Sequence, residues 1–88
     1  GQDLAINHLA DAISEGMSYY LGFGAGVNAG TSASNTALGY YALNSNTSGN
    51  FNTAIGASSL ARNTTGSYNV TIGKGAGFSS AYGSDNTI

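Results

Sequence analysis

Few residues of this chain could carry out catalysis, and the best candidates stand near its beginning. His8 is the only histidine, with Asp3 and Asp11 on either side of it. A histidine oriented by a carboxylate can activate a serine, and serines are plentiful here. However, the whole chain has only two basic and four acidic residues, whereas an active site needs several converging titratable groups. We therefore expect no enzymatic activity, and we interpret His8 as a partly exposed side chain in an irregular first unit.

Two glycine-rich stretches resemble nucleotide-binding loops but do not match their patterns. Residues 73–75 lack the Ser or Thr that follows the lysine of a phosphate loop, and Tyr68 stands where that loop requires a glycine. Residues 22–26 miss the dinucleotide fingerprint, because its last glycine would have to be Val27. The repeats hold a single aspartate, Asp85, so the calcium-binding Gly-Asp nonapeptide is absent too. The sequence predicts no cofactor and no metal site.

Composition excludes several other classes of function. The net charge of −2 gives no basic surface for a nucleic acid, and no apolar run is long enough to enter a membrane. The chain has no cysteine, so it has neither disulfides nor thiolate metal sites. Gly, Ala, Ser, Thr and Asn account for 57 of the 88 residues, a composition that could indicate low complexity.

A phrase repeated at a constant interval argues against disorder. The sequence Asn-Thr-Ala-Ile-Gly at residues 52–56 has close copies at 35–39 and 69–73, and a further copy begins at Asn86. The starting asparagines are therefore 17 residues apart each time. A fixed period of this kind is the signature of a repeat protein. It divides residues 18–88 into four full repeats and the start of a fifth.

Each repeat predicts one coil of an all-β solenoid or β-roll. Thr53 and Ile55 are β-formers separated by one residue, so they share one face of a short strand, and Gly56 suits a sharp corner. A small-then-Leu pair and an Asn-Thr-Ser/Thr-Gly turn complete the coil. The candidate core residues are Leu21, Leu38, Leu43, Ile55, Leu60 and Ile72. The predicted corner glycines are Gly22, Gly39, Gly56 and Gly73, and the predicted asparagine ladder is Asn35, Asn52, Asn69 and Asn86.

The first 17 residues allow two interpretations. Ile6, Leu9, Ile13 and Met17 have helical spacing, which predicts a short helix. The same segment also resembles a worn copy of the repeat, which predicts a degenerate first coil. The sequence leaves both open.

One chain has a thin core for a solenoid, so we expect it to associate with itself. A coil contains only two or three medium-sized apolar side chains, whereas ordering its residues costs about 1.5 kcal/mol each. A parallel homotrimer would bury a second face. The column of small residues formed by Ala42, Ser59 and Ala76 is the predicted place where the chains come close.

The repeat resembles a known class of sequences. Residues 35–49 look like the repeat of phage tail fibres and related secreted fibre proteins, and the Thr-Ala-Ile-Gly core is similar to the head repeats of trimeric autotransporter adhesins. The resemblance implies a homotrimeric β-rich fibre outside the cell or on a virion. It also implies that Thr53 and Ile55, with their counterparts in the other repeats, point into the roll. We further predict that Ala54, which lies between them, faces a neighbour.

Three functions follow as expectations. The first is a structural, non-enzymatic segment of a viral tail fibre or similar extracellular fibre that supports host attachment, with itself and adjoining fibre segments as partners. The second is a bacterial adhesin head that binds a host glycan or protein, for which the aromatic residues are candidates. The third is an ice-binding solenoid, suggested by Thr36, Thr53 and Thr87 in one column but interrupted by Val70.

Overall fold

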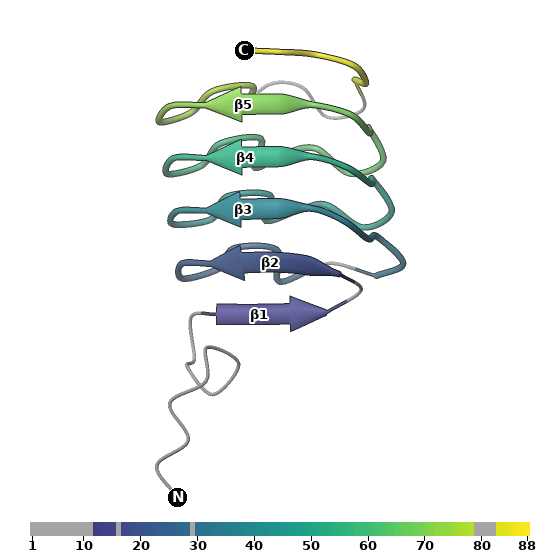
Figure 1. Ribbon diagram of the computed structural model, residues 1–88. Helices are drawn as coiled ribbons and strands as arrows, with labels where there is room; N and C mark the ends of the chain where they lie inside the picture. The colour runs from purple at the N-terminus through teal and green to yellow at the C-terminus, as the bar shows by residue number, and fades with distance from the viewer. Residues whose placement is uncertain (1–11, 16, 29, 79–82) are drawn as a thin grey trace, which may run out of the picture.

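The computed structural model describes residues 12–15, 17–28, 30–78 and 83–88, and these residues form an all-β structure with no helix. The strands follow one another in the sheet in the order of the sequence (Figure 1). They are β1 (Ala12–Glu15), β2 (Ser18–Leu21), β3 (Thr36–Leu38), β4 (Thr53–Ile55) and β5 (Val70–Ile72). β2 to β5 are parallel, and β1 pairs antiparallel with β2 at the N-terminal edge. A further parallel bridge joins Val70 to Thr87.

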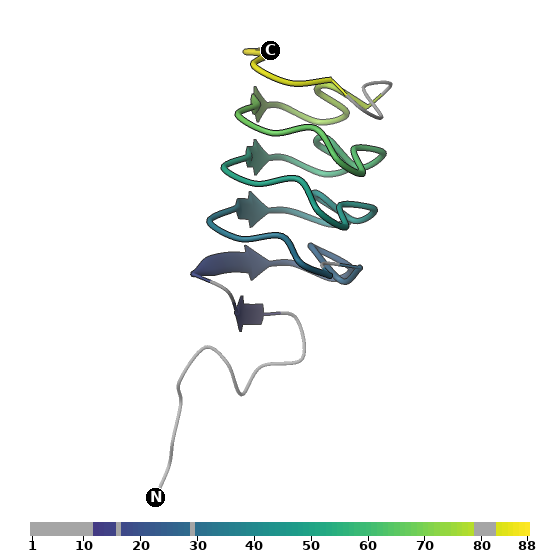
Figure 2. The same ribbon diagram turned by 90° about the vertical axis from the view of Figure 1, so that its right-hand side faces the viewer.

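The parallel strands stack in register at the repeat interval. Ala54 pairs with Ala37 on one side and with Thr71 on the other, so each residue lies beside its counterpart in the next repeat. The connections between strands also stack, as the side view shows (Figure 2). For example, the amide of Leu43 donates to the carbonyl of Ser59, and the amide of Leu60 donates to that of Ala76. Backbone bonds between repeats therefore hold the whole contour of the chain and not only the strands.

Only part of the first 17 residues falls within the described structure. β1 is a strand that pairs antiparallel with β2. For residues 12–15 this differs from both interpretations of the sequence, the short helix and the degenerate parallel coil. A short turn at Met17, with φ 62°, reverses the chain into β2. The rest of the prediction for this segment, including His8, Asp3 and Asp11, lies outside the described residues.

Corner glycines are required by backbone conformation and by close stacking. Gly56 follows β4 with φ 126°. A Cβ built on it would lie 2.6 Å from the carbonyl carbon and oxygen of Gly73 in the next repeat, closer than real contacts allow. Gly22 and Gly39 approach the next repeat in the same manner. The corner therefore has no room for a side chain wherever another repeat is stacked on it.

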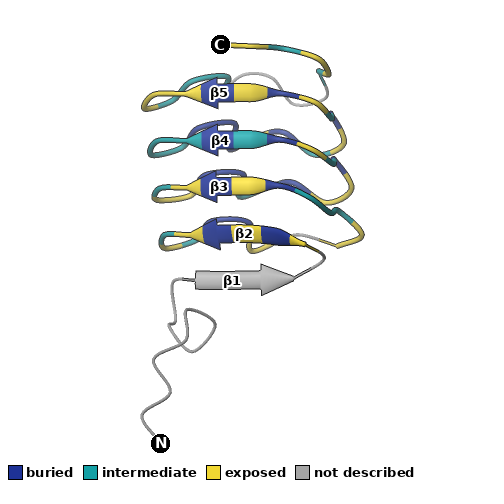
Figure 3. Cartoon of the chain, in the orientation of Figure 1, coloured by how far each residue is buried: buried dark blue, intermediate teal, exposed yellow. Residues whose placement is uncertain are grey.

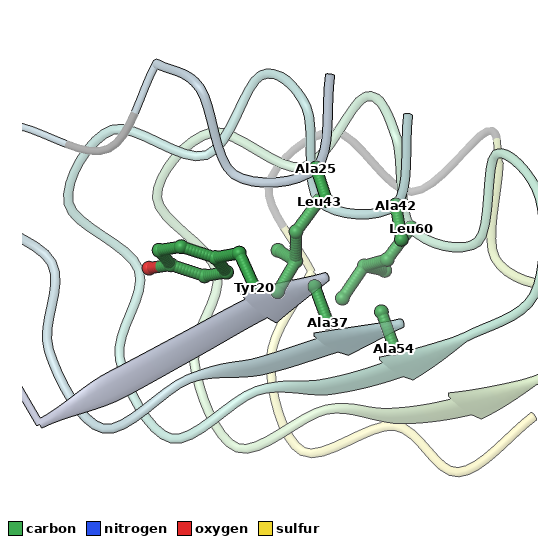
Figure 4. Close-up of a cluster of buried hydrophobic side chains, with 7 residues drawn as sticks. All are labelled: Tyr20, Ala25, Ala37, Ala42, Leu43, Ala54 and Leu60. Atoms are coloured by element: carbon green, nitrogen blue, oxygen red, sulfur yellow. The ribbon is translucent and has the colours of Figure 1, made fainter. Parts of the chain in front are cut away.

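In the core beneath the sheet, small residues of the strands pack against large residues of the segments that lie opposite. Ala37 and Ala54 point inward from β3 and β4, and Leu43 and Leu60 reach toward them from the facing segments (Figure 4). Both leucines are completely buried. The full cluster is Tyr20, Ala25, Ala37, Ala42, Leu43, Ala54 and Leu60.

In the first repeat the large residue of the core comes from the strand and the small one from the segment opposite. Tyr20 takes the strand position occupied by Ala37 in the next repeat, and Gly26 takes the position of Leu43. A Cβ on Gly26 would lie only 2.4 Å from the Tyr20 ring. The pair Tyr20 and Gly26 is thus equivalent in packing to the pair Ala37 and Leu43.

The structure corrects the prediction of which large residues form the core. Leu43 and Leu60 are core residues as predicted, but Leu21, Leu38 and Ile72 are exposed and Ile55 is only half-buried. The reason is the phase of the strand. In β3, β4 and β5 the buried asparagine before the strand and the small residue at its centre share the inner face, as Ser18 and Tyr20 do in β2, so the residues between and after them face outward.

The column of small residues is also placed differently from the prediction. Ala42 and Ser59 are completely buried within the chain, and Ala76 is half-buried. Ser59 Oγ lies 2.6 Å from Thr71 Oγ1, which points inward from β5. This column packs beneath the strands of its own chain and cannot be the surface where chains approach one another.

Candidate functional site

A ladder of buried asparagines fixes which way each strand faces. The Oδ1 atom of Asn52 accepts bonds from the backbone amide and from Nδ2 of Asn69, both at 3.0 Å. Nδ2 of Asn52 donates to the carbonyl of Gly66 at 2.9 Å. Asn35 and Asn86 continue the same ladder. Because the asparagine side chains are internal, the residues one and three positions after each asparagine must face outward.

A second stack of buried asparagines supports the turn at the far end of each repeat. Nδ2 of Asn63 donates to Oδ1 of Asn46 at 2.9 Å and to the carbonyl of Gly66 at 3.0 Å. Oδ1 of Asn63 is buried without a partner among the described residues. Gly66 therefore accepts bonds from both stacks, which ties the turn to the start of β4, the strand that precedes it.

The candidate functional site is the surface that the strands present to solvent, which we call the outer face. It consists of the two outward strand residues of each repeat and of the two exposed or half-buried residues that flank them: the residue before the ladder position, which Ser18 occupies in the first repeat, and the residue after the corner glycine. Its members are Met17, Tyr19, Leu21, Phe23; Ser34, Thr36, Leu38, Tyr40; Phe51, Thr53, Ile55, Ala57; and Tyr68, Val70, Ile72, Lys74. Figure 3 shows exposed residues alternating with buried ones along β2, β3 and β5.

The outer face is apolar along its centre. Leu21, Leu38, Ile55 and Ile72 stack in register from β2 to β5 and form a continuous aliphatic column. Leu38 is 45% exposed and Ile72 is 61% exposed. Lys74 is the only charged residue among the outer-face members. A contiguous exposed apolar strip of this kind usually marks a place where another molecule binds.

Aromatic rings border the outer face. Phe51 and Tyr68 stack with their ring centroids 5.1 Å apart, on the side where the strands begin. Phe23 and Tyr40 stack at 5.8 Å, on the side where the strands end, and Tyr41 lies 4.3 Å from Tyr40. A side-chain hydrogen bond with Tyr41 raises the pKa of the Tyr40 hydroxyl above its ordinary value of 10.0.

The residues weighed for catalysis and nucleotide binding form no such site in the described part of the chain, and His8, Asp3 and Asp11 lie outside it. Residues 73–75 form part of a corner, in which Gly73 and Gly75 adopt positive φ and Lys74 is exposed. The described residues contain no group of three or more His, Asp or Glu side chains that could hold a metal ion. No helix long and apolar enough to cross a membrane occurs in the described parts of the chain.

Sequence reasoning missed the outer face because it assigned Ile55 and its counterparts to the interior. The signal that could have found it was the asparagine ladder itself. If Asn52 is internal, the two-residue period of a strand places Ala54 inside and Ile55 outside. Both the ladder and the period were available in the sequence.

Comparison with known protein families, with curated proteins and with solved structures gives no match to this chain. The resemblance to fibre and adhesin repeats therefore stays a prediction, and the functional argument depends on the outer face.

Proposed function

We propose that this chain is a structural, non-enzymatic segment of a homotrimeric β-solenoid fibre, of the kind found in viral tail fibres and similar extracellular fibres that support attachment to a host. The observation that carries the proposal is the outer face, a regular apolar surface built from every strand of the parallel sheet. The fibre resemblance of the repeat supplies the trimeric state and the location.

Association would complete the burial that one chain lacks. Full burial of a Leu or Ile side chain contributes about 1.5–3 kcal/mol, so covering the half-exposed aliphatic column contributes about 1 kcal/mol for each member. The same column repeats in register at each strand, so a partner chain of the same repeat can follow it along its whole length. The repeat therefore matches an elongated assembly better than a compact ligand.

Light scattering on the purified chain tests this proposal. We expect a particle of three chains, each of 8.8 kDa. A folded monomer, recognised by its β-type circular dichroism, would overturn the proposed function. A stable dimer would overturn its trimeric form.

A charge on the outer face should abolish the assembly. Ile55→Asp places a carboxylate in the aliphatic column, where burial of an unpaired charge opposes association. We expect Ile55→Asp to remain folded as a monomer, because this side chain lies outside the chain's own core. Thr65→Asp is the matched control, since Thr65 is exposed in the turn before β5 and away from the outer face. An equal effect of both variants on assembly would contradict the role of the outer face.

A further inference from the structure

Three places in the repeats match the acceptor pattern of N-glycosylation, Asn-x-Ser/Thr. They begin at Asn46, Asn63 and Asn69. The pattern ordinarily indicates a surface loop, because the attached oligosaccharide is bulky and hydrophilic. Here all three asparagines have exposed fractions of 1% or less. The folded chain therefore holds the pattern in its interior, where a modifying enzyme cannot reach the acceptor amide.

The acceptor nitrogens are also occupied by hydrogen bonds. Nδ2 of Asn69 donates to Oδ1 of Asn52 at 3.0 Å and to the carbonyl of Gly83 at 2.9 Å. Nδ2 of Asn63 likewise donates two bonds, at 2.9 and 3.0 Å. A side-chain amide has only two N–H donors. Both hydrogens of these two nitrogens are therefore used within the stack of repeats.

Transfer of an oligosaccharide removes one of these donors. The reaction forms a bond between Nδ2 and the anomeric carbon of the sugar, and it breaks the bond from that carbon to the diphosphate of a lipid carrier. One Nδ2 proton leaves, so a single N–H remains. On Asn63 or Asn69, the change would leave a buried acceptor without its partner, which destabilises the fold.

The space around the acceptor amides is filled by the neighbouring backbone. A Cβ built on Gly66 would lie 2.5 Å from Oδ1 of Asn63, closer than real contacts allow. A Cβ built on Gly49 would lie equally close, 2.5 Å, to Oδ1 of Asn46. A site that cannot admit one more carbon atom cannot admit a sugar ring.

We propose that N-glycosylation and folding of this chain exclude one another. The three sites accept an oligosaccharide only while the chain is unfolded, and a chain modified at any of them cannot close its stack of repeats. The inference is independent of the trimeric assembly, because each asparagine is buried within a single chain. The repeat therefore folds in full only where no N-glycosylation enzyme meets the unfolded chain.

Production by two routes tests the proposal. The full chain is made in a bacterial cytoplasm without N-glycosylation, and it is also directed through a eukaryotic secretory pathway by a cleavable signal. We expect the bacterial product to fold. We expect the secreted wild type to carry oligosaccharide, identified by mass spectrometry, and to lose most of its folded yield, measured by protease resistance and circular dichroism.

A matched variant removes the acceptor patterns but keeps every asparagine. Ser48→Ala and Thr65→Ala change exposed side chains. Thr71→Ala introduces the residue type that stands at the paired positions of β3 and β4. Ser59 Oγ keeps its bond of 3.3 Å to the backbone carbonyl of residue 71. The triple variant should fold equally well by both routes.

Arg62→Asn, added to the triple variant, separates burial from the presence of a glycan. It creates the acceptor pattern at residues 62–64, with an exposed first position beside the buried Asn63. This chain should carry oligosaccharide and still fold. Loss of folding with a glycan at residue 62 would overturn the role of burial. A protease-resistant wild-type chain after secretion, with or without a glycan at the native sites, would overturn the proposal and leave the proposed function intact.

Discussion

Exchanging the sizes of Tyr20 and Gly26 should expose strong energetic coupling between them. Tyr20→Ala alone removes a buried ring that is 2% exposed, and large-to-small changes of this kind cost about 3–5 kcal/mol. Gly26→Leu alone forces a side chain into the space of that ring. We expect this overpacking to cost about 1–3 kcal/mol. The positive φ of Gly26 adds about 1–2 kcal/mol for a residue with a side chain.

The double variant should be far more stable than the sum of these costs predicts. Tyr20→Ala combined with Gly26→Leu would reproduce the arrangement of Ala37 and Leu43, and Leu43 already adopts φ 53° at the corresponding position. Only the backbone strain of about 1–2 kcal/mol should remain. The coupling energy should therefore be at least about 3 kcal/mol, well above the usual error of additivity for independent sites.

Urea unfolding followed by circular dichroism, at one protein concentration for all variants, measures this coupling. Gly24→Leu combined with Tyr20→Ala is the control, because a Cβ on Gly24 would collide with the Tyr41 ring and not with Tyr20. Tyr20→Ala should not rescue Gly24→Leu. Additive costs for Tyr20→Ala and Gly26→Leu would refute the exchange of sizes that we infer from the packing.

Two further predictions concern the stacking of the repeats. Gly56→Ala and Gly73→Ala both place alanine at φ 126°, but of the two only the new Cβ at residue 56 would collide with the backbone of the next repeat. Gly56→Ala should therefore lower the free energy of unfolding by at least about 2 kcal/mol more than Gly73→Ala in the same urea assay. Equal losses would show that backbone conformation alone selects the glycine. Asn52→Ala leaves the amide of Asn69 buried without a partner and removes one of the two side-chain bonds to the carbonyl of Gly66, so it should cost about 3 kcal/mol. Asn44→Ala removes one partly buried bond to Gly24 and should cost about 1 kcal/mol. Thermal unfolding of the two variants side by side checks this order, and similar melting temperatures would contradict it.

The 17-residue interval and the parallel stacking could be predicted from the sequence because the residues on which they depend recur at the same positions of the repeats. Asparagine before the strand and glycine after it have few alternatives in a tightly stacked backbone. The orientation of Ile55 could not be obtained from hydrophobicity alone, since a large aliphatic residue suits the interior of a chain and an interface between chains equally well. The asparagine ladder decides its orientation, and Leu60 agrees with it, because this leucine fills the interior from the opposite side and leaves room only for Ala54.

Left-handed backbone at residues other than glycine was also missed. Leu43 and Leu60 adopt φ 53° and 52°, a conformation that costs such residues energy. The sequence held a signal, because Gly26 and Gly77 occupy the same column. A position that accepts either glycine or leucine indicates a positive φ combined with an internal side chain.

The in-register stacking of the strands has a mechanical consequence. Each repeat advances the structure by one strand spacing, about 4.8 Å, whereas the same 17 residues in an α-helix would extend about 25 Å. The chain is therefore shorter per residue than a helix, but it has a thicker cross-section and hydrogen bonds that run along its axis. Adding or deleting one whole repeat would change the length in small equal steps without rotating the outer face out of line, so recombination between repeats could adjust length while preserving shape.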